Sequence, residues 1–429
     1  MFNVRQWLKA MPILFFCSMK IQSIIVGCLL LLLVSCSQAQ QSEPTISTQA
    51  AQPTHSSFSY ANLKATLNTI QQHFAPDKRT EPFLMETQQV GDSLIISIDV
   101  GKKEAVKVLD SLAATLHQVP VRIITSLLPD KSAREKGHAV VNVSVCNIRS
   151  RPEHSAELVT QALMGMPLKV WKKKNGWYLV QTPDHYLGWV DGGGIERMTL
   201  QKFAQWKAKP KAIVIPLFSM AYEKPDMQAA TVTDLTAGNV VATFGATNGF
   251  RQVGFPDGRK AYVPDNQLKE LQEWLSTAKP TEANLVSTAR RMVGIPYLWG
   301  GTSPKGMDCS GFTKTVYWLN GLIIPRDASQ QVWAGVEVDN QRDFAKLRPG
   351  DLLFFGQPAT DSTAERVVHV GMWIGNGEFI HASGMIRISS MNPQAANFDK
   401  YEYNRYLRAK RLIHANDDKY LITANKVLE

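Results

Sequence analysis

Cys309, His369 and His381 are residues of the types that perform nucleophilic catalysis, and all three lie in the last third of the chain. Apolar residues recur at helical spacing after Cys309, which predicts a helix over residues 310–319 with the cysteine near its N-terminus. Free N–H groups and the helix dipole favour an anion there, so they would lower the pKa of the thiol and stabilise an oxyanion. A lone cysteine is more often buried and inert, so the two histidines are what favours catalysis.

The histidines fall in a predicted β-hairpin with Gly375-Asn-Gly377 as its turn. Polar and apolar positions alternate over residues 367–374, which puts His369 and Gly371 on the same face. A two-residue loop would place the histidines on opposite faces, whereas a three-residue loop with a bulge would pair Gly371 with His381 and place both on one face. We predict the three-residue loop, because only that register makes the imidazoles diagonal neighbours at roughly 7–8 Å.

These residue types supply a nucleophile, a base and an orienting group. Cys309 facing His369 forms a Cys–His pair, and His381 can hold the base in the required tautomer. Zinc binding is the competing interpretation, because cysteine and histidine are both zinc ligands. We expect no metal and no cofactor, since the three residues are widely spaced and no second cysteine lies near them.

Four short motifs around these residues resemble the NlpC-type cysteine peptidases of bacterial cell walls. The motifs are Asp308-Cys-Ser-Gly-Phe312, Arg348-Pro-Gly-Asp-Leu-Leu-Phe-Phe355, His369-Val-Gly with Gly375, and Ile380-His-Ala382. The resemblance extends over residues 281–414 and implies a papain-like α+β domain, in which the helix with the cysteine packs on an antiparallel sheet. It implies Cys309 as nucleophile, His369 as general base and His381 as the third member of the triad.

The same resemblance implies a substrate cleft around the nucleophile. Tyr297 matches a tyrosine that lines the cleft near the oxyanion, and Asp308 and Ser310 flank the cysteine as substrate-binding residues. The Asp308 carboxylate would receive the free amine of an N-terminal L-Ala, which needs a charged partner once it loses water. A helix N-cap is a second role for the same side chain. Ser329 stands where a serine that contacts the substrate is expected.

Two upstream segments share a pattern of short strands and turns that indicates small β-barrels. Residues 137–200 and 211–275 each contain an aromatic–x–x–Val–x–x–Pro–Asp stretch, which resembles bacterial SH3-like domains. With these domains the chain is similar to the γ-D-glutamyl-L-diamino acid endopeptidases, whose first SH3-like domain closes the substrate cleft. Tyr186 matches a tyrosine that contacts the L-Ala amine, and Glu157 is the nearest candidate for a glutamate that the family takes from this domain.

The N-terminal segment has the layout of a bacterial lipoprotein signal. Lys20 precedes an apolar run from Ile21 to Val34, which is shorter than the roughly 20 residues that span a membrane. The run ends at Leu33-Val-Ser-Cys36, which resembles the lipoprotein box. We therefore expect residues 1–35 to be a signal peptide and Cys36 to carry lipid, which anchors the protein in the cell envelope, facing the periplasm from the outer membrane of a Gram-negative bacterium. An uncleaved anchor helix is the alternative.

The rest of the sequence predicts a tether, a small α/β unit and the peptidase domain. Residues 36–57 are rich in Gln, Ser, Thr, Ala and Pro, as flexible tethers are. Residues 58–136 predict the α/β unit, and residues 280–429 the peptidase, so the fold class is multidomain α+β. With 44% hydrophobic and 20% charged residues among 429, the chain is neither wholly disordered nor a coiled coil, and five cysteines are too few for a disulfide scaffold.

Together these features predict a cysteine endopeptidase that hydrolyses the γ-D-Glu–diamino acid bond of peptidoglycan stem peptides and prefers muropeptides with a free N-terminal L-Ala. Two alternatives stay open: a peptidase that acts on intact peptidoglycan, and a catalytically inert peptidoglycan-binding lipoprotein. The net charge of +10 alone would also suit nucleic acid, but the export signal argues against that partner. We expect a monomer that meets muropeptides and, through its lipid, a membrane.

Overall fold

The computed structural model describes residues 59–117 and 119–429. The predicted signal peptide, the lipidation site Cys36 and the predicted tether lie outside these residues. In the part of the chain that the structure describes, no helix is long and apolar enough to cross a membrane.

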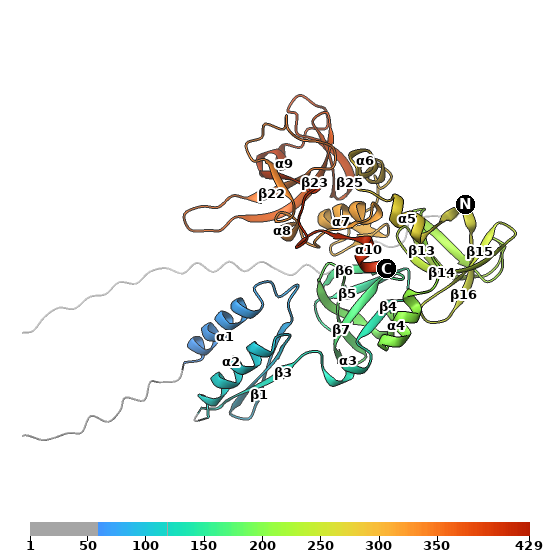
Figure 1. The fold of residues 1–429 in the computed structure, drawn as a ribbon. Coiled ribbons are helices and arrows are strands. Elements are labelled where there is room, and N and C mark those ends of the chain that lie inside the picture. The colour runs from blue at the N-terminus through green and yellow to red at the C-terminus, as the bar shows by residue number, and fades with distance from the viewer. Residues whose placement is uncertain (1–58, 118) are drawn as a thin grey trace, which may run out of the picture. The chain divides into compact units, whose positions relative to one another are not determined.

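The first described unit is a three-stranded sheet with two helices (Figure 1). Its elements are α1 (Tyr60–Phe74), β1 (Phe83–Val90), β2 (Ser93–Val100), α2 (Lys103–Ala114) and β3 (Val121–Leu127). Strand β1 runs antiparallel to β2 and β3 runs parallel to it, so α2 is the crossover that a parallel pair needs. The helices bury Leu67 and Leu109 in one core with Ile98 of β2. This is the small α/β unit that the sequence predicts.

Two seven-stranded antiparallel sheets follow, and they are the two SH3-like domains of the predicted fold class. The first, in the order β10-β4-β7-β8-β9-β5-β6, contains β4 (His138–Val141), β5 (Val145–Arg149), β6 (Leu158–Leu163), β7 (Pro167–Lys174), β8 (Trp177–Gln181), β9 (Leu187–Asp191) and β10 (Ile195–Met198). The second, in the order β13-β12-β16-β15-β14-β11-β17, contains β11 (Lys211–Val214), β12 (Phe218–Tyr222), β13 (Thr231–Thr236), β14 (Val240–Thr247), β15 (Phe250–Gly254), β16 (Lys260–Pro264) and β17 (Leu268–Glu270). The short helices around them are α3 (Lys131–Glu135), α4 (Leu200–Lys207) and α5 (Leu271–Thr277). In β5 the side chains of Cys146 and Ile148 are buried and Asn147 is exposed, which is the alternation of a barrel strand.

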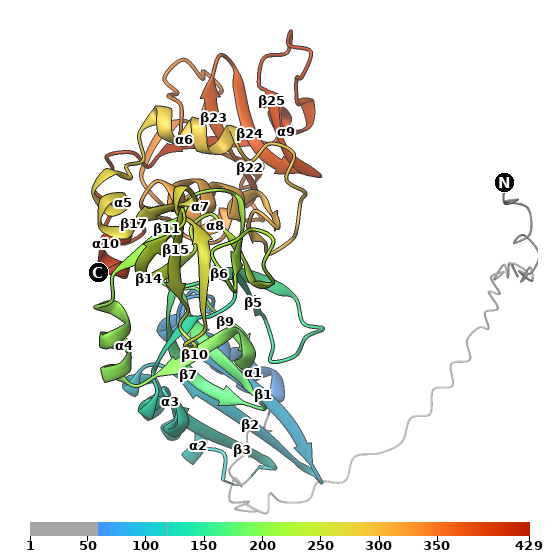
Figure 2. The same cartoon turned by 90° about the vertical axis from the view of Figure 1, so that its right-hand side faces the viewer.

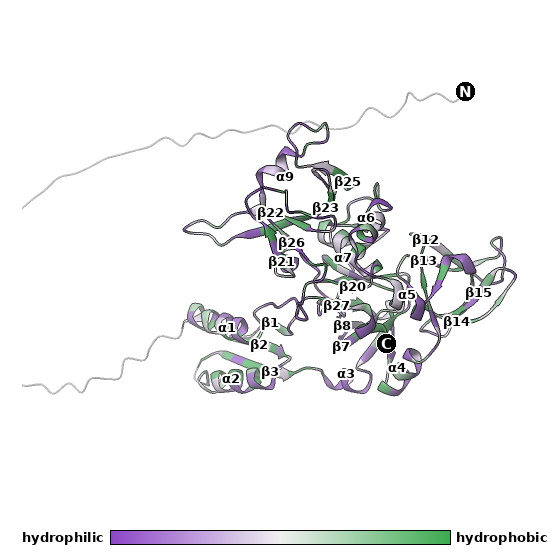
Figure 3. Ribbon diagram, turned by 45° about the horizontal axis from the view of Figure 1, so that its top comes forward, coloured by the Kyte–Doolittle hydropathy of each residue, from purple (hydrophilic) through white to green (hydrophobic). Residues whose placement is uncertain are grey.

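The C-terminal domain is a six-stranded antiparallel sheet with helix α7 against one face (Figures 1 and 2). In the order β21-β26-β22-β23-β24-β25, the sheet contains β21 (Val336–Asp339), β22 (Leu352–Gln357), β23 (Arg366–Gly375), β24 (Glu378–Ser383), β25 (Met385–Ser390) and β26 (Tyr406–Arg411). The helices are α6 (Glu282–Arg290), α7 (Cys309–Leu319), α8 (Ala328–Gln331), α9 (Lys400–Asn404) and α10 (Ala424–Leu428), and two small strand pairs are β18 (Thr302–Ser303) with β19 (Gly306–Met307) and β20 (Leu322–Ile323) with β27 (Ile422–Thr423). Strands β23 and β25 carry hydrophobic stretches, green in Figure 3. Phe312 and Val316 of α7 pack in one core with Phe354, Val370 and Ile380 of the sheet, as the predicted apolar helix face requires.

A buried ion pair connects the first barrel to helix α7. Asp184, in the turn between β8 and β9, pairs with Lys314, and their side chains are only 4% and 12% exposed. Burial would raise the pKa of Asp184, but the Lys314 ammonium and a hydrogen bond from Thr182 lower it overall. The barrel is thereby held against the helix that carries Cys309.

Replacing Asp184 with alanine should destabilise the protein by about 3–5 kcal/mol, because Lys314 is then a buried charge without a partner. The double variant Asp184→Ala/Lys314→Met should recover most of the loss, and Asp257→Ala, which breaks a more exposed pair with Arg259, should cost at most about 1 kcal/mol. Urea unfolding of the four proteins measures these differences. An equal loss in the single and double variants would show that the buried charge is not the cause.

Candidate active site

Helix α7 begins at Cys309, one residue before the predicted start, and the residue before it caps the helix. The Asp308 carboxylate accepts a hydrogen bond from the Gly311 N–H at 2.7 Å. A Cβ at Gly311 would lie 2.0 Å from the carbonyl oxygen of Gly301, so only glycine lets that loop pack against the helix start. The Asp-Cys-Ser-Gly motif therefore fixes the thiol at the first residue of the helix, where Cys309 is 8% exposed.

The protonation state of Cys309 differs from the expected one. Burial raises the pKa of the thiol to about 12, and the Asp308 carboxylate adds to the rise. Backbone N–H groups of Val370 and Ser310 oppose it without cancelling it. The prediction that the helix start lowers this pKa is wrong, because the loss of hydration costs a thiolate more than the helix end returns. Cys309 is a neutral thiol at neutral pH and needs a base to become a nucleophile.

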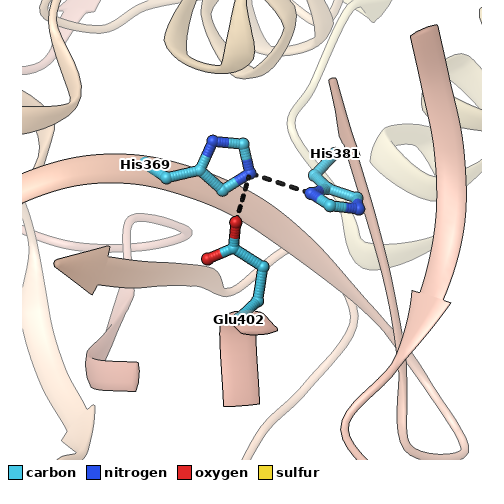
Figure 4. A group of neighbouring side chains, drawn as sticks. All are labelled: His369, His381 and Glu402. Carbon is cyan, nitrogen blue, oxygen red and sulfur yellow. Dashed lines mark hydrogen bonds and ion pairs between the residues drawn. The ribbon is translucent and has the colours of Figure 1, made fainter. Parts of the chain in front are cut away.

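The two histidines meet on one face of the β23–β24 hairpin (Figure 4). Nε2 of His369 lies 2.8 Å from Nδ1 of His381, which is hydrogen-bond distance, and both residues are buried. A Cβ at Gly371 would lie 2.6 Å from a ring carbon of Phe379 and 3.2 Å from Cβ of His381. Glycine at this position thus lets β24 pack closely enough against β23 to hold Phe379 and His381 where they are.

The predicted register of this hairpin is confirmed, but its turn is different. Gly375 pairs with Glu378, so the turn has two residues in place of the predicted three. A bulge before Gly375 then shifts the register, and Met372 pairs with Ile380. The extra residue lies in the strand and not in the loop, with the same effect of bringing both histidines to one face.

A buried carboxylate completes a group of three possible metal ligands. The ligand atoms of His369, His381 and Glu402 all lie within 4.8 Å of one another (Figure 4). However, Nη2 of Arg405 donates to both oxygens of Glu402, at 2.7 and 2.8 Å, and the facing imidazole nitrogens already share a hydrogen bond. This chemistry fits a hydrogen-bonded network better than a metal centre, because a cation would have to displace both interactions.

His369 is held in its neutral form in this environment. Burial lowers its pKa to about 3, and the charges of His381 and Arg405 act in the same direction, against smaller opposing contributions from Asp399 and Asp308. The Cys309 thiol and the His369 imidazole are therefore both uncharged at neutral pH.

The pH dependence of kcat/KM should show this depressed pKa. If His369 must be neutral to accept a proton, activity is lost only as the pH falls through its lowered pKa, so the acid limb should lie well below 6.5. The charged or titratable groups around His369 are His381 on β24, Glu402 on α9 and Arg405 after it, with smaller contributions to its pKa from Asp399 and Asp308. A pH series from 4 to 9 with a peptide substrate measures the limb. An acid limb at or above pH 6.5 would contradict the assignment.

One cavity of about 730 Å³ opens beside the nucleophile. Its walls come from the N-terminal α/β unit, the first barrel and the peptidase domain. Six of the residues predicted for the site line it: Glu157, Tyr186, Asp308, Cys309, Ser310 and Ser329. His369 and His381 are not among the residues that line this cavity, and both are buried in the β23–β24 hairpin.

Asp308 has its charge balanced inside the protein. Arg326 donates to its two carboxylate oxygens, at 3.0 and 2.6 Å, and Gly300 N–H donates to it at 2.9 Å. The Ser310 hydroxyl accepts from the same guanidinium at 3.0 Å. Arg326 is 1% exposed, and it is a residue of the site that was missed from the sequence. Its signal was present, since Arg326 and Asp327 stand directly before α8, the helix that contains Ser329.

Tyr297 lies half-buried beside the thiol. Burial raises the pKa of its hydroxyl to about 12, with further contributions from Cys309 and Asp308. The neutral phenol can therefore donate a hydrogen bond near the nucleophile.

The first barrel brings a carboxylate and a phenol hydroxyl to the cavity. Glu157 accepts a hydrogen bond from Nε1 of Trp299 at 2.7 Å, and among the described residues no lysine, arginine or histidine lies within 4 Å of its carboxylate. The Tyr186 hydroxyl donates to Asp327 at 3.0 Å. Asp327 and Trp299 are further cavity residues that the sequence analysis did not identify.

The N-terminal unit also reaches this cavity. Nη1 of Arg79 donates to Asp327 at 2.8 Å and to Ser329 at 2.9 Å, while Asp77 holds the other side of the guanidinium. The backbone of Arg79 also accepts from the Leu187 N–H of the barrel at 2.7 Å. No sequence signal identified Arg79, because its partners lie about 250 residues away.

A buried thiol on a helix start, two histidines on a facing hairpin and an antiparallel sheet beneath them define a cysteine peptidase of papain-like architecture. Residues 294–418 match the NlpC/P60 family, and residues 148–194 match the bacterial dipeptidyl-peptidase Sh3 domain. The chain belongs to the NlpC/P60 family, and its C-terminal domain is a peptidoglycan peptidase domain of that family. Membership in a family of cell-wall peptidases implies export to the cell envelope.

Relatives share more than the catalytic domain. A γ-D-glutamyl-L-lysine dipeptidyl-peptidase of Bacillus cereus is 33% identical over 235 residues, which cover 53% of this chain and 67% of that protein. Dipeptidyl-peptidase 6 of Lysinibacillus sphaericus is 28% identical over 60% of this chain and 93% of its own. The crystal structure of an NlpC/P60 family protein from Bacillus cereus superposes with a TM-score of 0.55 at 26% identity, covering 64% of this chain and 99% of that one.

Proposed function

We propose that this protein hydrolyses the bond between the γ-carboxyl of D-Glu and the diamino acid in peptidoglycan stem peptides, and that it prefers muropeptides with a free N-terminal L-Ala. The observation that carries the proposal is the single cavity lined by Cys309 and by the oxygen-rich group of Glu157, Tyr186 and Asp327. The names of the relatives, which specify γ-D-glutamyl-L-lysine, support the same bond.

In this proposal Cys309 attacks and His369 moves the proton. The thiol passes its proton to the ring nitrogen of His369 that does not face His381, and Sγ attacks the γ-carbonyl carbon. N–H groups at the start of α7 stabilise the oxyanion, with the Tyr297 hydroxyl beside them. His369 then protonates the leaving amine of the diamino acid, which departs and leaves a thioester on Cys309.

Water completes the reaction through the same histidine. His369 removes a proton from a water molecule that attacks the thioester, and collapse of the intermediate releases L-Ala-D-Glu and returns the proton to Cys309. His381 holds the ring of His369 throughout, and Ser310 and Ser329 contact the bound peptide.

Recognition of the amine falls to the barrel side of the cavity. The charge of Asp308 is compensated by Arg326, which makes it a poorer partner for an ammonium than the sequence suggested. Among the described residues Glu157 has no cation within 4 Å of its carboxylate, so we place the amine at Glu157. Arg79 and Tyr186 both contact Oδ2 of Asp327, and we propose its other oxygen, Oδ1, as a second acceptor for the amine. Asp308 keeps the roles of helix cap and support for the cavity wall.

Three substrates separate this function from its alternatives. The protein is incubated with L-Ala-γ-D-Glu-diaminopimelate, with its N-acetylated form and with intact sacculi, and mass spectrometry identifies the products. We expect L-Ala-D-Glu from the first substrate only. Product from none of them would leave peptidoglycan binding as the function. Cleavage of sacculi as fast as the free peptide would reject the preference for a free amine.

We also propose that Cys36 carries lipid and holds the enzyme at the outer membrane, facing the periplasm, where released muropeptides pass. The lipoprotein-like box before Cys36 supports this. Mass analysis of the mature N-terminus, with Cys36→Ala as control, tests it, and a mature chain that retains residues 1–35 would contradict it.

A further inference from the structure

The hydrogen bond between the two histidines continues away from the nucleophile. Nε2 of His381 lies 3.0 Å from the hydroxyl oxygen of Ser389 on β25, and that oxygen lies 3.3 Å from Oδ2 of Asp399. Ser389 is 4% exposed, and the Asp399 side chain is 10% exposed. Asp399 is held in place as the N-cap of α9, where it accepts from the Glu402 N–H at 3.1 Å. Four side chains thus form one line from His369 to Asp399.

The carboxylate of Asp399 determines which atom donates and which accepts in each hydrogen bond along this line. An ionised carboxylate only accepts hydrogen bonds, so the Ser389 hydroxyl donates to Asp399 and its oxygen is left to accept from Nε2–H of His381. Nδ1 of His381 then has no proton and accepts from Nε2–H of His369. The proton of neutral His369 is therefore on Nε2, and its Nδ1 is the free base.

If every hydrogen bond in this line ran the other way, Nδ1 of His369 would no longer be a free base. If the Ser389 hydroxyl donated to His381, the proton of His381 would be on Nδ1 and would point at Nε2 of His369. Neutral His369 would then carry its proton on Nδ1 and could not accept one from a thiol there. The two arrangements differ only in which atoms hold protons. A small difference in free energy set at Ser389 and Asp399 therefore decides whether Nδ1 of His369 can accept a proton from the thiol.

Glu402 also favours the arrangement in which the proton of His369 is on Nε2. Its Oε1 lies 3.8 Å from Nε2 of His369, and Figure 4 shows this nitrogen facing both Glu402 and His381 while the other nitrogen of the ring points away from them. A carboxylate at this place favours a proton on Nε2. The Arg405 guanidinium fixes the carboxylate there through two hydrogen bonds.

Arg387 is the group that opposes this arrangement of protons. Its Nε lies 3.5 Å from Nε2 of His381, where a donor would favour the reversed line. Ser389 is closer to the same nitrogen, at 3.0 Å, and Nη2 of Arg387 also donates to Asp399 at 3.3 Å. At 3.5 Å the contact is at the limit of a hydrogen bond, so the serine determines the direction.

We propose that Ser389 and Asp399 are positioning residues that set the tautomer of His369 through His381. The inference rests on the proposed function, in which His369 is the base, but it makes a statement about proton location that does not require turnover. It extends the catalytic group by two residues from β25 and the start of α9.

The tautomer itself is the first test. Nitrogen-15 NMR of histidine-labelled full-length protein, with the His369 and His381 signals assigned from single substitutions, should show His369 protonated on Nε2 and not on Nδ1. In Asp399→Asn the amide can also donate, so the bias is lost and protonated Nδ1 of His369 should appear. Asparagine caps helices as well as aspartate does, so α9 is kept. An unchanged tautomer in this variant would overturn the proposal even if the enzyme proved inactive on every peptide.

Kinetics is the second test. Asp399→Asn and Ser389→Ala should each lower kcat on the free-amine peptide by about 10- to 100-fold and leave KM within about twofold, because only the state of the base changes. Ser389→Thr retains a hydroxyl and should recover most of kcat. Asn397→Ala, next to this line and bonded to Glu378 instead, is the matched control and should retain activity. Equal loss in Asn397→Ala, or a lower urea midpoint in Asp399→Asn that accounts for its loss, would reduce Asp399 to a structural residue and overturn the proposal.

Discussion

Replacing Cys309 with alanine should lower kcat/KM on L-Ala-γ-D-Glu-diaminopimelate by about 10⁴-fold or more, since the proposed thioester forms on its sulfur. The fold should not change, because Asp308 still caps α7 and Gly311 still packs on the loop at Gly301. The variant should therefore still bind the peptide. Steady-state kinetics gives the first quantity and calorimetry the second.

The matched control for this prediction is the other thiol of the described chain. Cys146 is free and buried in the first barrel, and burial raises its pKa to about 12, as it does for Cys309. The two cysteines thus have similarly raised pKa values and differ in their surroundings. Of the two, Cys309 is the one that lines the cavity and packs against the β23–β24 hairpin. Cys146→Ala should retain activity. More than about 1% of wild-type activity in Cys309→Ala would mean that the nucleophile has been assigned to the wrong residue.

Local sequence patterns were sufficient for the elements that carry the triad. The apolar spacing after Cys309 predicts α7, and the turn at Gly375-Asn-Gly377 with an alternating strand before it predicts the hairpin. Gly371 is consistent with this register, because a Cβ there would collide with the Phe379 ring and crowd the Cβ of His381. The position of the extra residue could not be predicted, since a bulge in the strand and a longer loop give the same register.

The charges of the site could not be predicted in this way. Whether a thiol at a helix start is acidic depends on how much water reaches it, and the domains that surround Cys309 come from distant parts of the sequence. The same holds for Asp308, whose amine-binding role depends on whether Arg326 reaches it first. Pattern reasoning identifies which residues could be charged, but only packing decides which charges are already paired.

The partners outside the motifs were also invisible to the sequence. Arg79 meets Asp327 and Ser329 across about 250 residues, and Asp399 is connected to His369 through the side chains of Ser389 and His381. Each looks like an ordinary surface charge in its own segment. Through Arg79 the N-terminal α/β unit forms part of the cavity wall.

Acetylation of the substrate's N-terminal amine should lower kcat/KM by about 100-fold or more. An ammonium in the cavity forms charge-assisted hydrogen bonds with Glu157 and Asp327, and the acetyl group removes its charge and leaves those carboxylates facing an apolar methyl. A loss of this size corresponds to about 3 kcal/mol, which two such hydrogen bonds can supply. Paired assays of the free and acetylated peptides with the wild-type enzyme measure the ratio. A ratio of the two kcat/KM values near one would show that the cavity does not recognise the amine.

Glu157→Gln shows whether the carboxylate from the barrel is responsible for this selectivity. The variant should lose about three- to tenfold in kcat/KM on the free-amine peptide, a modest effect because Glu157 is exposed and its charge is screened. On the acetylated peptide the same substitution should change little, since no ammonium is present to pair with it. Glu153→Gln, on the same loop and paired with Arg151, should affect neither substrate and controls for net charge. If Glu157→Gln weakened both substrates equally, Glu157 would shape the cavity without recognising the amine, and Asp327 would have to carry the selectivity that the first SH3-like domain is proposed to provide.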